Sequence, residues 1–387
     1  VYKNGLAVSI PNTAGQRGNL VAGVLGALIR RPDLKMEVLR EVTPELVQRA
    51  AELIAGQHAR IAYDPARTSL YIDVRLACGR RTSRAVLAHG HTHLVRLEAD
   101  RRVLFQAEGD QGAPTPLPYK RRLKRRRLSD LVALAAKLDD ADRDYIRLGV
   151  DLNLAIAAAG RRLPKVGHYL LDLVRKGYLQ DDVFASSKIL VAAASDARMA
   201  GLNYPVMASG RSGNQGIVPT LVPWNVGRSF GVAEATVVES IALSHLVNSY
   251  IKCFTGDLSP LCGCAIAAGV GAAVAIVYQL RGPQVEPMTL AVNSLVSDLG
   301  GMLCDGAKGG CALKVVSSTE STIRAAYMAL NDHGITEAEG FVGRSAEETI
   351  KNISRIGEIG MSLVDKTLLG IMGDKVTRNR TLPGPED

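Results

Sequence analysis

The chain has 387 residues, more than a single hydrophobic core usually organises, so we expect two domains. Hydrophobic residues make up 47% and charged residues 22%, a composition that excludes wholesale disorder. Six cysteines are too few for a disulfide-stapled secreted scaffold and suit a reducing compartment. No basic stub leads into an apolar run, so we find no signal peptide and expect a cytoplasmic protein.

The net charge of +9 comes mainly from one octapeptide, Lys120–Arg127 (KRRLKRRR), whose seven basic residues leave +2 for the remainder. Proteins that bind nucleic acid usually spread basic residues over a face, and aromatic residues that could stack on bases are only 4% of this chain. We interpret the run as a solvated linker or helix start. A basic nucleic-acid-binding protein is the remote alternative.

Residues 1–107 mix two hydrophobic periodicities, which predicts a small α/β domain. The Thr43-Pro44 pair is a helix start with proline in the first turn. Helical spacing covers Asn19–Arg31 and Pro44–Ile54, and strand patterns cover Arg60–Tyr63, Leu70–Ala77, Ala85–His89 and Thr92–Leu97.

Residues 108–118 (EGDQGAPTPLP) contain two glycines and three prolines and are the predicted linker. Residues 119–387 are predicted to form a larger all-α domain, so the fold class is α+β. Leu261–Tyr278 is almost wholly apolar but is rich in Ala and Gly, which favours an internal helix over a membrane span. The predicted helices are Leu128–Leu138, Tyr145–Ala159, His168–Val174, Ser186–Ala197, Ala235–Tyr250, Ile266–Leu280, Met288–Leu299, Thr322–Leu330, Ala346–Ile356 and Leu363–Ile371.

Four cysteines lie within one 50-residue region of the predicted all-α domain: Cys262, Cys264, Cys304 and Cys311. The last two bracket a glycine-rich loop that could fold tightly around a metal or cluster. Their irregular spacing suits an iron–sulfur cluster and a set of buried core thiols equally well, whereas structural zinc is a poorer match.

A polar loop between two predicted helices is the second candidate site. It contains Ser209, Arg211, Ser212, Gly213, Asn214 and Gln215, whose hydroxyl, guanidinium, amide and backbone groups could hold a carboxylate. An ordinary turn-rich connection would explain the same composition. His245 lies in a predicted helix and fits a satisfied interior or near-site histidine better than a metal ligand.

Four stretches together resemble the L-cysteine desulfidases, which are related to the iron–sulfur L-serine dehydratase alpha chain. They are SDARMAGLNYPVMASGRSGNQGIVPTLVP, ALSHLVNSYIK, LSPLCGCAIAAGVGAA and GGMLCDGAKGGCALKV. The resemblance extends from YKNGLAVSIP near the start to RIGEIGMSLVDKTLLGIM near the end. It implies a lyase that converts L-cysteine to pyruvate, ammonia and sulfide; L-serine dehydration with the same cofactor is the alternative.

The resemblance also implies a 4Fe-4S cluster held by Cys262, Cys304 and Cys311, with Cys264 as the alternative first ligand, and no pyridoxal phosphate. The polar loop would bind the small amino-acid substrate. The family carries a further cysteine, proposed as the base, in a Gly-Cys-Thr-Glu-Pro motif that nothing here matches. We therefore expect the N-terminal domain to be incomplete and the base to lie upstream of Val1, with Lys308 as the fallback within the chain. We expect a homodimer that does not associate with membranes.

Overall fold

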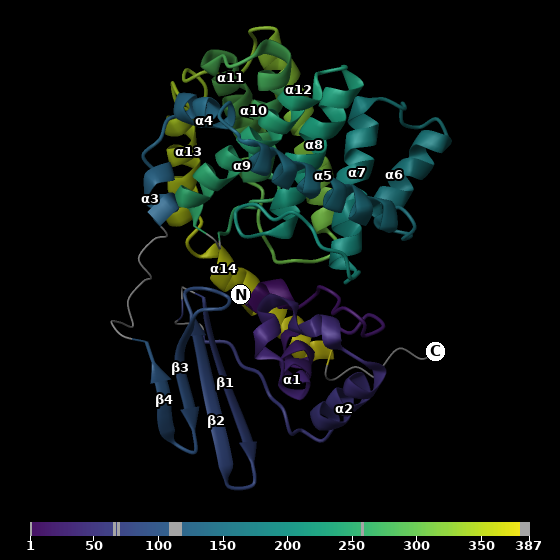
Figure 1. Cartoon of the computed structure of the whole chain (residues 1–387), viewed down its shortest axis with the longest axis vertical. Coiled ribbons are helices and arrows are strands. Elements are labelled where there is room, and N and C mark those ends of the chain that lie inside the picture. The colour runs from purple at the N-terminus through teal and green to yellow at the C-terminus, as the bar shows by residue number, and fades with distance from the viewer. Residues whose placement is uncertain (1, 65–66, 68–69, 108–117, 257–258, 380–387) are drawn as a thin grey trace. The chain divides into compact units, whose positions relative to one another are not determined.

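The chain divides into two compact units, Val1–Leu117 and Pro118–Asp387 (Figure 1). The structure is a computed structural model that describes residues 2–64, 67, 70–107, 118–256 and 259–379. We call Val1–Leu117 the N-terminal unit and Pro118–Asp387 the helical unit. Together they form the predicted α+β fold, and the strands found among the described residues all lie in the N-terminal unit. The predicted linker lies outside the described residues except for Pro118, which begins the first helix of the helical unit.

The N-terminal unit combines helices with a four-stranded sheet. Thr43 caps its second long helix by accepting a hydrogen bond from the Leu46 amide, and Pro44 occupies the first turn as predicted. The helices pack around a small apolar cluster that includes Leu25 and Ala50. The elements are η1 (Tyr2–Gly5), α1 (Asn19–Ile29), η2 (Pro32–Glu41), α2 (Pro44–Ala55), β1 (Tyr71–Cys78), β2 (Arg81–Ala88), β3 (Leu94–Ala99) and β4 (Arg102–Gln106).

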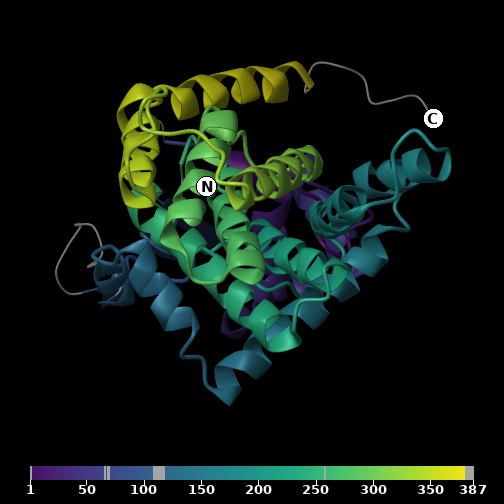
Figure 2. The same ribbon diagram turned by 90° about the horizontal axis from the view of Figure 1, so that it is seen from above.

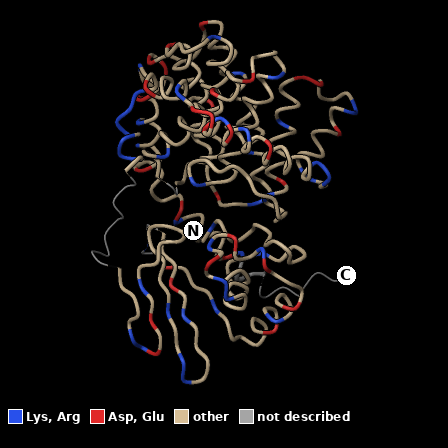
Figure 3. Tube along the Cα trace, in the orientation of Figure 1, with Lys and Arg blue, Asp and Glu red and all other residues tan. Residues whose placement is uncertain are grey.

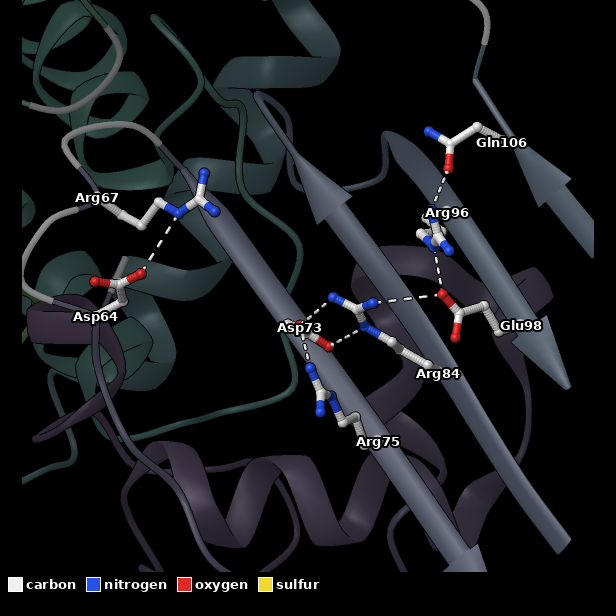
Figure 4. Close-up of polar contacts among 8 residues, drawn as sticks. All are labelled: Asp64, Arg67, Asp73, Arg75, Arg84, Arg96, Glu98 and Gln106. Atoms are coloured by element: carbon white, nitrogen blue, oxygen red, sulfur yellow. Dashed lines mark hydrogen bonds and ion pairs between the residues drawn. The ribbon is translucent and has the colours of Figure 1, made fainter. Parts of the chain in front are cut away.

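The sheet is an antiparallel meander in the order β1-β2-β3-β4, and charged side chains cross-link its strands (Figure 4). The Arg84 guanidinium donates to both carboxylate oxygens of Asp73, at 3.0 and 2.7 Å, and to Glu98 at 3.4 Å. Arg96 donates to Glu98 and to Gln106. Because these groups are partly exposed, each pair contributes little stability, but together they favour one register of the strands.

Two strand predictions in the N-terminal unit need correction. Arg60–Tyr63 is irregular, and it has no hydrogen-bonded partner strand among the described residues. Its short alternation of polar and apolar residues was therefore insufficient to make a strand. Conversely, β4 was missed because its hairpin turn, Asp100-Arg101, lacks the usual Asn-Gly signal although both residues have positive φ values, 49° and 67°.

The described part of the helical unit contains the ten predicted helical stretches, two α-helices that were not predicted, α3 and α8, and the short π-helix η3. Its helices cross at several angles and do not form one parallel bundle (Figures 1 and 2). The elements are α3 (Pro118–Leu123), α4 (Leu128–Ala135), α5 (Asp140–Gly160), α6 (Val166–Arg175), α7 (Val183–Met199), α8 (Gly213–Ser229), α9 (Glu234–Thr255), α10 (Ile266–Arg281), α11 (Val285–Leu299), α12 (Cys311–Leu330), α13 (Ala346–Arg355), η3 (Ile356–Gly360) and α14 (Val364–Asn379).

Helix α10 is the centre of the helical unit, as the apolar run predicted. It packs against α8, α9, α11 and α12, and every residue from Ile266 to Gln279 is buried. Small residues allow these close contacts: a Cβ at Gly271 would lie 2.4 Å from the Ser244 carbonyl oxygen of α9. Among the described residues, no helix is both long and apolar enough to cross a membrane.

The basic run follows the surface of the helical unit. It covers most of α3 and the turn that leads into α4, and Figure 3 shows it as a nearly continuous blue segment. Leu123 is its buried residue, whereas Arg121, Arg122 and residues 124–127 are exposed. This arrangement agrees with the interpretation of a solvated helix start.

The close contact between α5 and α7 generates a stability prediction. A Cβ at Gly160 would lie 1.9 Å from the Ala193 carbonyl oxygen, so Gly160→Ala must push the two helices apart. We expect a loss of about 1–3 kcal/mol in the free energy of unfolding, measured by urea titration followed by circular dichroism. Gly370→Ala is the matched control, because a Cβ there meets nothing within 4 Å and Ala favours the helix. Equal stability of the two variants would contradict the predicted clash.

Candidate functional site

Two chain segments pair to bring Cys262 and Cys304 together. The Cys262 amide donates to the Met302 carbonyl oxygen at 2.9 Å, and the Cys304 amide donates to the Pro260 carbonyl oxygen at 2.7 Å. The residues between them, Leu261 and Leu303, form an isolated antiparallel bridge. The loop entering α10 is thereby joined to the glycine-rich loop entering α12.

Cys311 is the first residue of α12, and its amide donates to the Lys308 carbonyl oxygen at 2.9 Å. One turn later, Lys314 Nζ donates to the Leu303 carbonyl oxygen and to Asp305 Oδ1, each at 2.5 Å. Asp305 is also ion-paired with Lys308. This ion cluster closes the loop that carries Cys304 and Cys311.

The thiols influence one another electrostatically. A hydrogen bond from Cys264 lowers the pKa of Cys262 to about 6 despite burial, and the charge of Lys314 acts in the same direction. The same hydrogen bond and burial raise the pKa of Cys264, and burial is the main cause of the raised pKa of Cys311. Because metals bind the thiolate, a readily ionised Cys262 suits a ligand.

The donor set fits an iron–sulfur cluster in its chemistry. Thiolate is the usual ligand of such clusters, and the only carboxylate described in this loop, on Asp305, is already paired with two lysines. Of the four thiols, Cys262 alone is buried. This weakens the alternative interpretation that the four cysteines are simply buried core residues. In the described part of the chain, no three or more His, Cys, Asp or Glu side chains form a preorganised metal site. The individual ligands therefore remain a prediction.

The polar loop forms a tight turn followed directly by a helix. The amides of Ser209 and Ser212 each donate to the other's carbonyl oxygen, at 3.1 and 2.9 Å. The two residues between them, Gly210 and Arg211, have φ values of 52° and 66°, as a turn with two left-handed central residues requires. Gly213, Asn214 and Gln215 then form the first turn of α8.

Sequence analysis missed α8 because Pro219 and Pro223 lie inside it and each removes an amide donor. Burial compensates: residues 213–223 are all buried, and the Pro223 carbonyl oxygen accepts a hydrogen bond from Gln279 Nε2 at 2.9 Å. Asn153 of α5 anchors both ends of the polar loop, accepting from the Met207 amide and donating to the Gly216 carbonyl oxygen. The loop is thus held on a rigid support.

The structure brings the polar loop next to the thiols. A Cβ at Gly263, between Cys262 and Cys264, would lie 2.7 Å from Gln215 Nε2. Arg198 of α7 donates to Asn214 Oδ1 at 3.3 Å, and its charge interacts with the thiols of Cys264 and Cys311. The two candidate regions proposed separately from sequence therefore adjoin in the fold.

The predicted site residues differ in their surroundings. Asn214 and Gln215 are buried, Ser209 is buried and accepts from Asn248 Nδ2 at 2.7 Å, and Arg211 is exposed at the tip of the turn. Lys308, the fallback base, is engaged in an ion pair with Asp305. Their roles in substrate binding and catalysis remain predictions.

Sequence reasoning missed three residues that the fold adds to the site: Arg198, Asn248 and Lys314. All three lie in stretches that carry the family resemblance, but sequence analysis gave none of them a role. A polar residue among the apolar positions of a buried helix was the available signal for Asn248, which has no exposed surface.

Residues 34–370 match the serine dehydratase alpha chain family. A UPF0597 protein of Geobacter sulfurreducens is 60% identical over 375 residues, which cover 97% of this chain and 87% of that protein. A UPF0597 protein of Elusimicrobium minutum is 50% identical over 375 residues, covering 97% and 88%. One of Alkaliphilus oremlandii is 35% identical over 375 residues, covering 96% and 86%.

His245, on α9 close to the site, generates a pH prediction. Its Nε2 lies 3.1 Å from Thr220 Oγ1, which donates its own hydrogen to the Gly216 carbonyl oxygen, so Nε2–H is the donor. Desolvation lowers the pKa of His245 to about 4. The histidine pKa in the unfolded chain is ~6.5, so as the pH falls the unfolded chain binds a proton before the folded chain does. The free energy of unfolding is therefore unaffected by this group above pH ~6.5 and decreases as the pH falls towards 4.

Between pH 7 and pH 5 we expect this histidine to cost about 2 kcal/mol of unfolding free energy. His245→Gln retains a donor for Thr220 but cannot titrate. The decrease in its free energy of unfolding between pH 7 and pH 5 should therefore be smaller than that of the unmodified protein by this amount. Urea titrations at the two pH values measure the difference. Identical pH dependence in the two proteins would show that His245 is not held neutral in the fold.

Proposed function

The chain belongs to the serine dehydratase alpha chain family, and on this premise we propose that it is an iron–sulfur lyase that releases sulfide from L-cysteine. The observation that carries the proposal is that the two paired segments that carry the cysteines adjoin a buried polar loop. Gln215 lies against Gly263 of the Cys-Gly-Cys segment, and Arg198 donates to Asn214 while its charge interacts with the thiols of Cys264 and Cys311. Substrate-binding groups thus adjoin groups that suit a metal cofactor.

Cys262, Cys304 and Cys311 would hold a 4Fe-4S cluster, with Cys264 as the alternative first ligand. When bound by three cysteines, such a cluster supplies an open iron that acts as a Lewis acid. The ion cluster of Lys314, Asp305 and Lys308 keeps the loop closed around this position and places positive charge beside the thiolates. A labile cofactor of this kind fits a reducing cytoplasm.

The chain's own residues would bind and orient the substrate. Elimination removes the Cα proton of L-cysteine and breaks the Cβ–S bond, whose electron pair leaves with sulfide; the resulting enamine takes up water to give pyruvate and ammonia. The rigid polar loop would hold the α-carbon so that the proton faces a base, which this reaction requires within hydrogen-bonding reach. No lysine Schiff base is needed, so pyridoxal phosphate has no part in the proposal.

L-Serine is the second candidate substrate, and the family description favours it directly. The elimination is the same except that hydroxide leaves in place of hydrosulfide. The two side chains differ by one atom, and the described groups of the site act on the shared amino-acid portion. The family and the site therefore support β-elimination in both cases.

The cysteine assignment predicts the metal content of variants. Anaerobically purified protein should be brown and should bleach in air, because an open iron is exposed to oxidation. Cys304→Ser and Cys311→Ser should each lose at least half of the bound iron and the visible absorbance, whereas Cys78→Ser, at an exposed position in the N-terminal unit, should retain both. Iron analysis and absorbance spectra measure this. Full iron content in Cys311→Ser would reject that ligand.

The substrate assignment predicts the products. Under anaerobic conditions L-cysteine should yield pyruvate, ammonia and sulfide in equal amounts, and L-serine should yield pyruvate and ammonia more slowly. Assays of pyruvate and sulfide with each amino acid decide between the two substrates. Pyruvate from L-serine alone would establish the dehydratase and reject the desulfidase, and turnover of neither by iron-loaded protein would reject both.

A further inference from the structure

Arg198 is positively charged, and no carboxylate among the described residues forms an ion pair with it. Its guanidinium donates a hydrogen bond to the neutral amide oxygen Asn214 Oδ1. Gly213 lies directly against the guanidinium, since a Cβ there would be 2.4 Å from Arg198 Nε. A charge withdrawn from water is costly unless an opposite charge meets it. The arrangement therefore suits an anionic ligand.

The start of α8 adds to this anion-binding character. Ser212 occupies the N-cap position but makes no side-chain capping hydrogen bond to the first turn. The amides of Gly213, Asn214 and Gln215 thus lie at the positive end of a 17-residue helix, next to the Arg198 guanidinium. A planar carboxylate matches the forked donors of arginine better than a spherical anion does.

Two buried acceptors lie beside the same turn. Gln215 Oε1 and Asn248 Oδ1 are shielded from solvent and have no hydrogen-bond partner in the described structure. Gln215 presents its free oxygen to Gly210, where a Cβ would be 2.9 Å from Oε1, whereas Asn248 presents its nitrogen, with Nδ2 at 3.0 Å. Asn248 Nδ2 donates a hydrogen bond to Ser209 Oγ, and this bond fixes the orientation of the side-chain amide and hence of its unpaired Oδ1. Unsatisfied buried oxygens of this kind favour a ligand that brings N–H donors.

We propose that Arg198, with the first turn of α8, binds the α-carboxylate of the substrate, and that Gln215 Oε1 and Asn248 Oδ1 accept hydrogen bonds from its α-ammonium group. In an α-amino acid these two groups are two bonds apart, about 2.5 Å, so adjoining anion and cation anchors match one molecule. The site thereby selects free α-amino acids and rejects amides, peptides and 2-hydroxy acids, because each of these leaves a buried group without its partner.

This inference rests on the proposed function for the nature of the ligand, but its test does not need turnover. L-Alanine has both anchoring groups and no β leaving group, so it binds without reacting. Calorimetric titration of the anaerobically purified full chain should show that L-alanine binds at least tenfold more tightly than L-alaninamide, which lacks the carboxylate, or L-lactate, which lacks the ammonium. Equal binding of all three, or no binding of L-alanine, would overturn the proposal.

Arg198→Met should weaken L-alanine binding roughly ten- to a hundredfold and abolish the preference over L-alaninamide. Arg198→Lys should recover part of the affinity, because a charge remains but the fork does not. Arg175→Met is the matched control, since Arg175 is exposed at the end of α6. Retained preference for L-alanine in a folded Arg198→Met protein would overturn the carboxylate assignment.

The ammonium anchor has its own variant, which also serves if Arg198→Met fails to fold. Gln215→Leu should keep the preference over L-alaninamide and reduce the preference over L-lactate by roughly tenfold. An unchanged preference over L-lactate would overturn the role of Gln215. Selective binding of L-alanine without turnover of cysteine or serine would contradict the lyase and leave these anchors in place, so failure of the two proposals is distinguishable.

Discussion

The site depends on the pairing of two short segments, Pro260–Cys262 and Met302–Cys304. Two backbone hydrogen bonds, at 2.9 and 2.7 Å, hold these segments antiparallel at the entrances of α10 and α12. Helix α10 is buried along almost its full length, so it fixes one segment in place. The other is tied down by Lys314, which reaches back from α12 to the Leu303 carbonyl oxygen. Cysteines separated by about forty residues in sequence thereby share one location.

The surroundings of these thiols differ on two sides. On one side, Asp305 is ion-paired with both Lys308 and Lys314, and these two ion pairs close the loop. On the other side, Arg198 lacks a carboxylate partner and the oxygens of Gln215 and Asn248 lack donors among the described residues. Buried polar groups in folded proteins are normally paired, so unpaired ones gathered around one turn indicate where a ligand belongs. The ion pairs of Asp305 support the loop, whereas Arg198, Gln215 and Asn248 remain available to bind a ligand.

How much of this was predictable from sequence depended on the range of the interactions. The apolar run predicted α10, and the density of cysteines and glycines indicated both loops, because these signals are local. Helix α8 was missed since its prolines oppose helix formation locally, and only tertiary burial explains it. The roles of Arg198, Asn248 and Lys314 arise from contacts between distant elements, such as the bond from Asn248 to Ser209, which no local pattern encodes. The family resemblance indicated the serine dehydratase alpha chain family, and the fold showed that the two candidate regions adjoin.

The most direct test of the account is a crystal structure of the anaerobically purified chain grown with L-alanine. The account predicts an iron–sulfur cluster bonded to Cys262, Cys304 and Cys311, with the alanine carboxylate on Arg198 and its ammonium beside Gln215 and Asn248. A cluster bound by other residues, or alanine bound away from the first turn of α8 in a cluster-containing crystal, would contradict it.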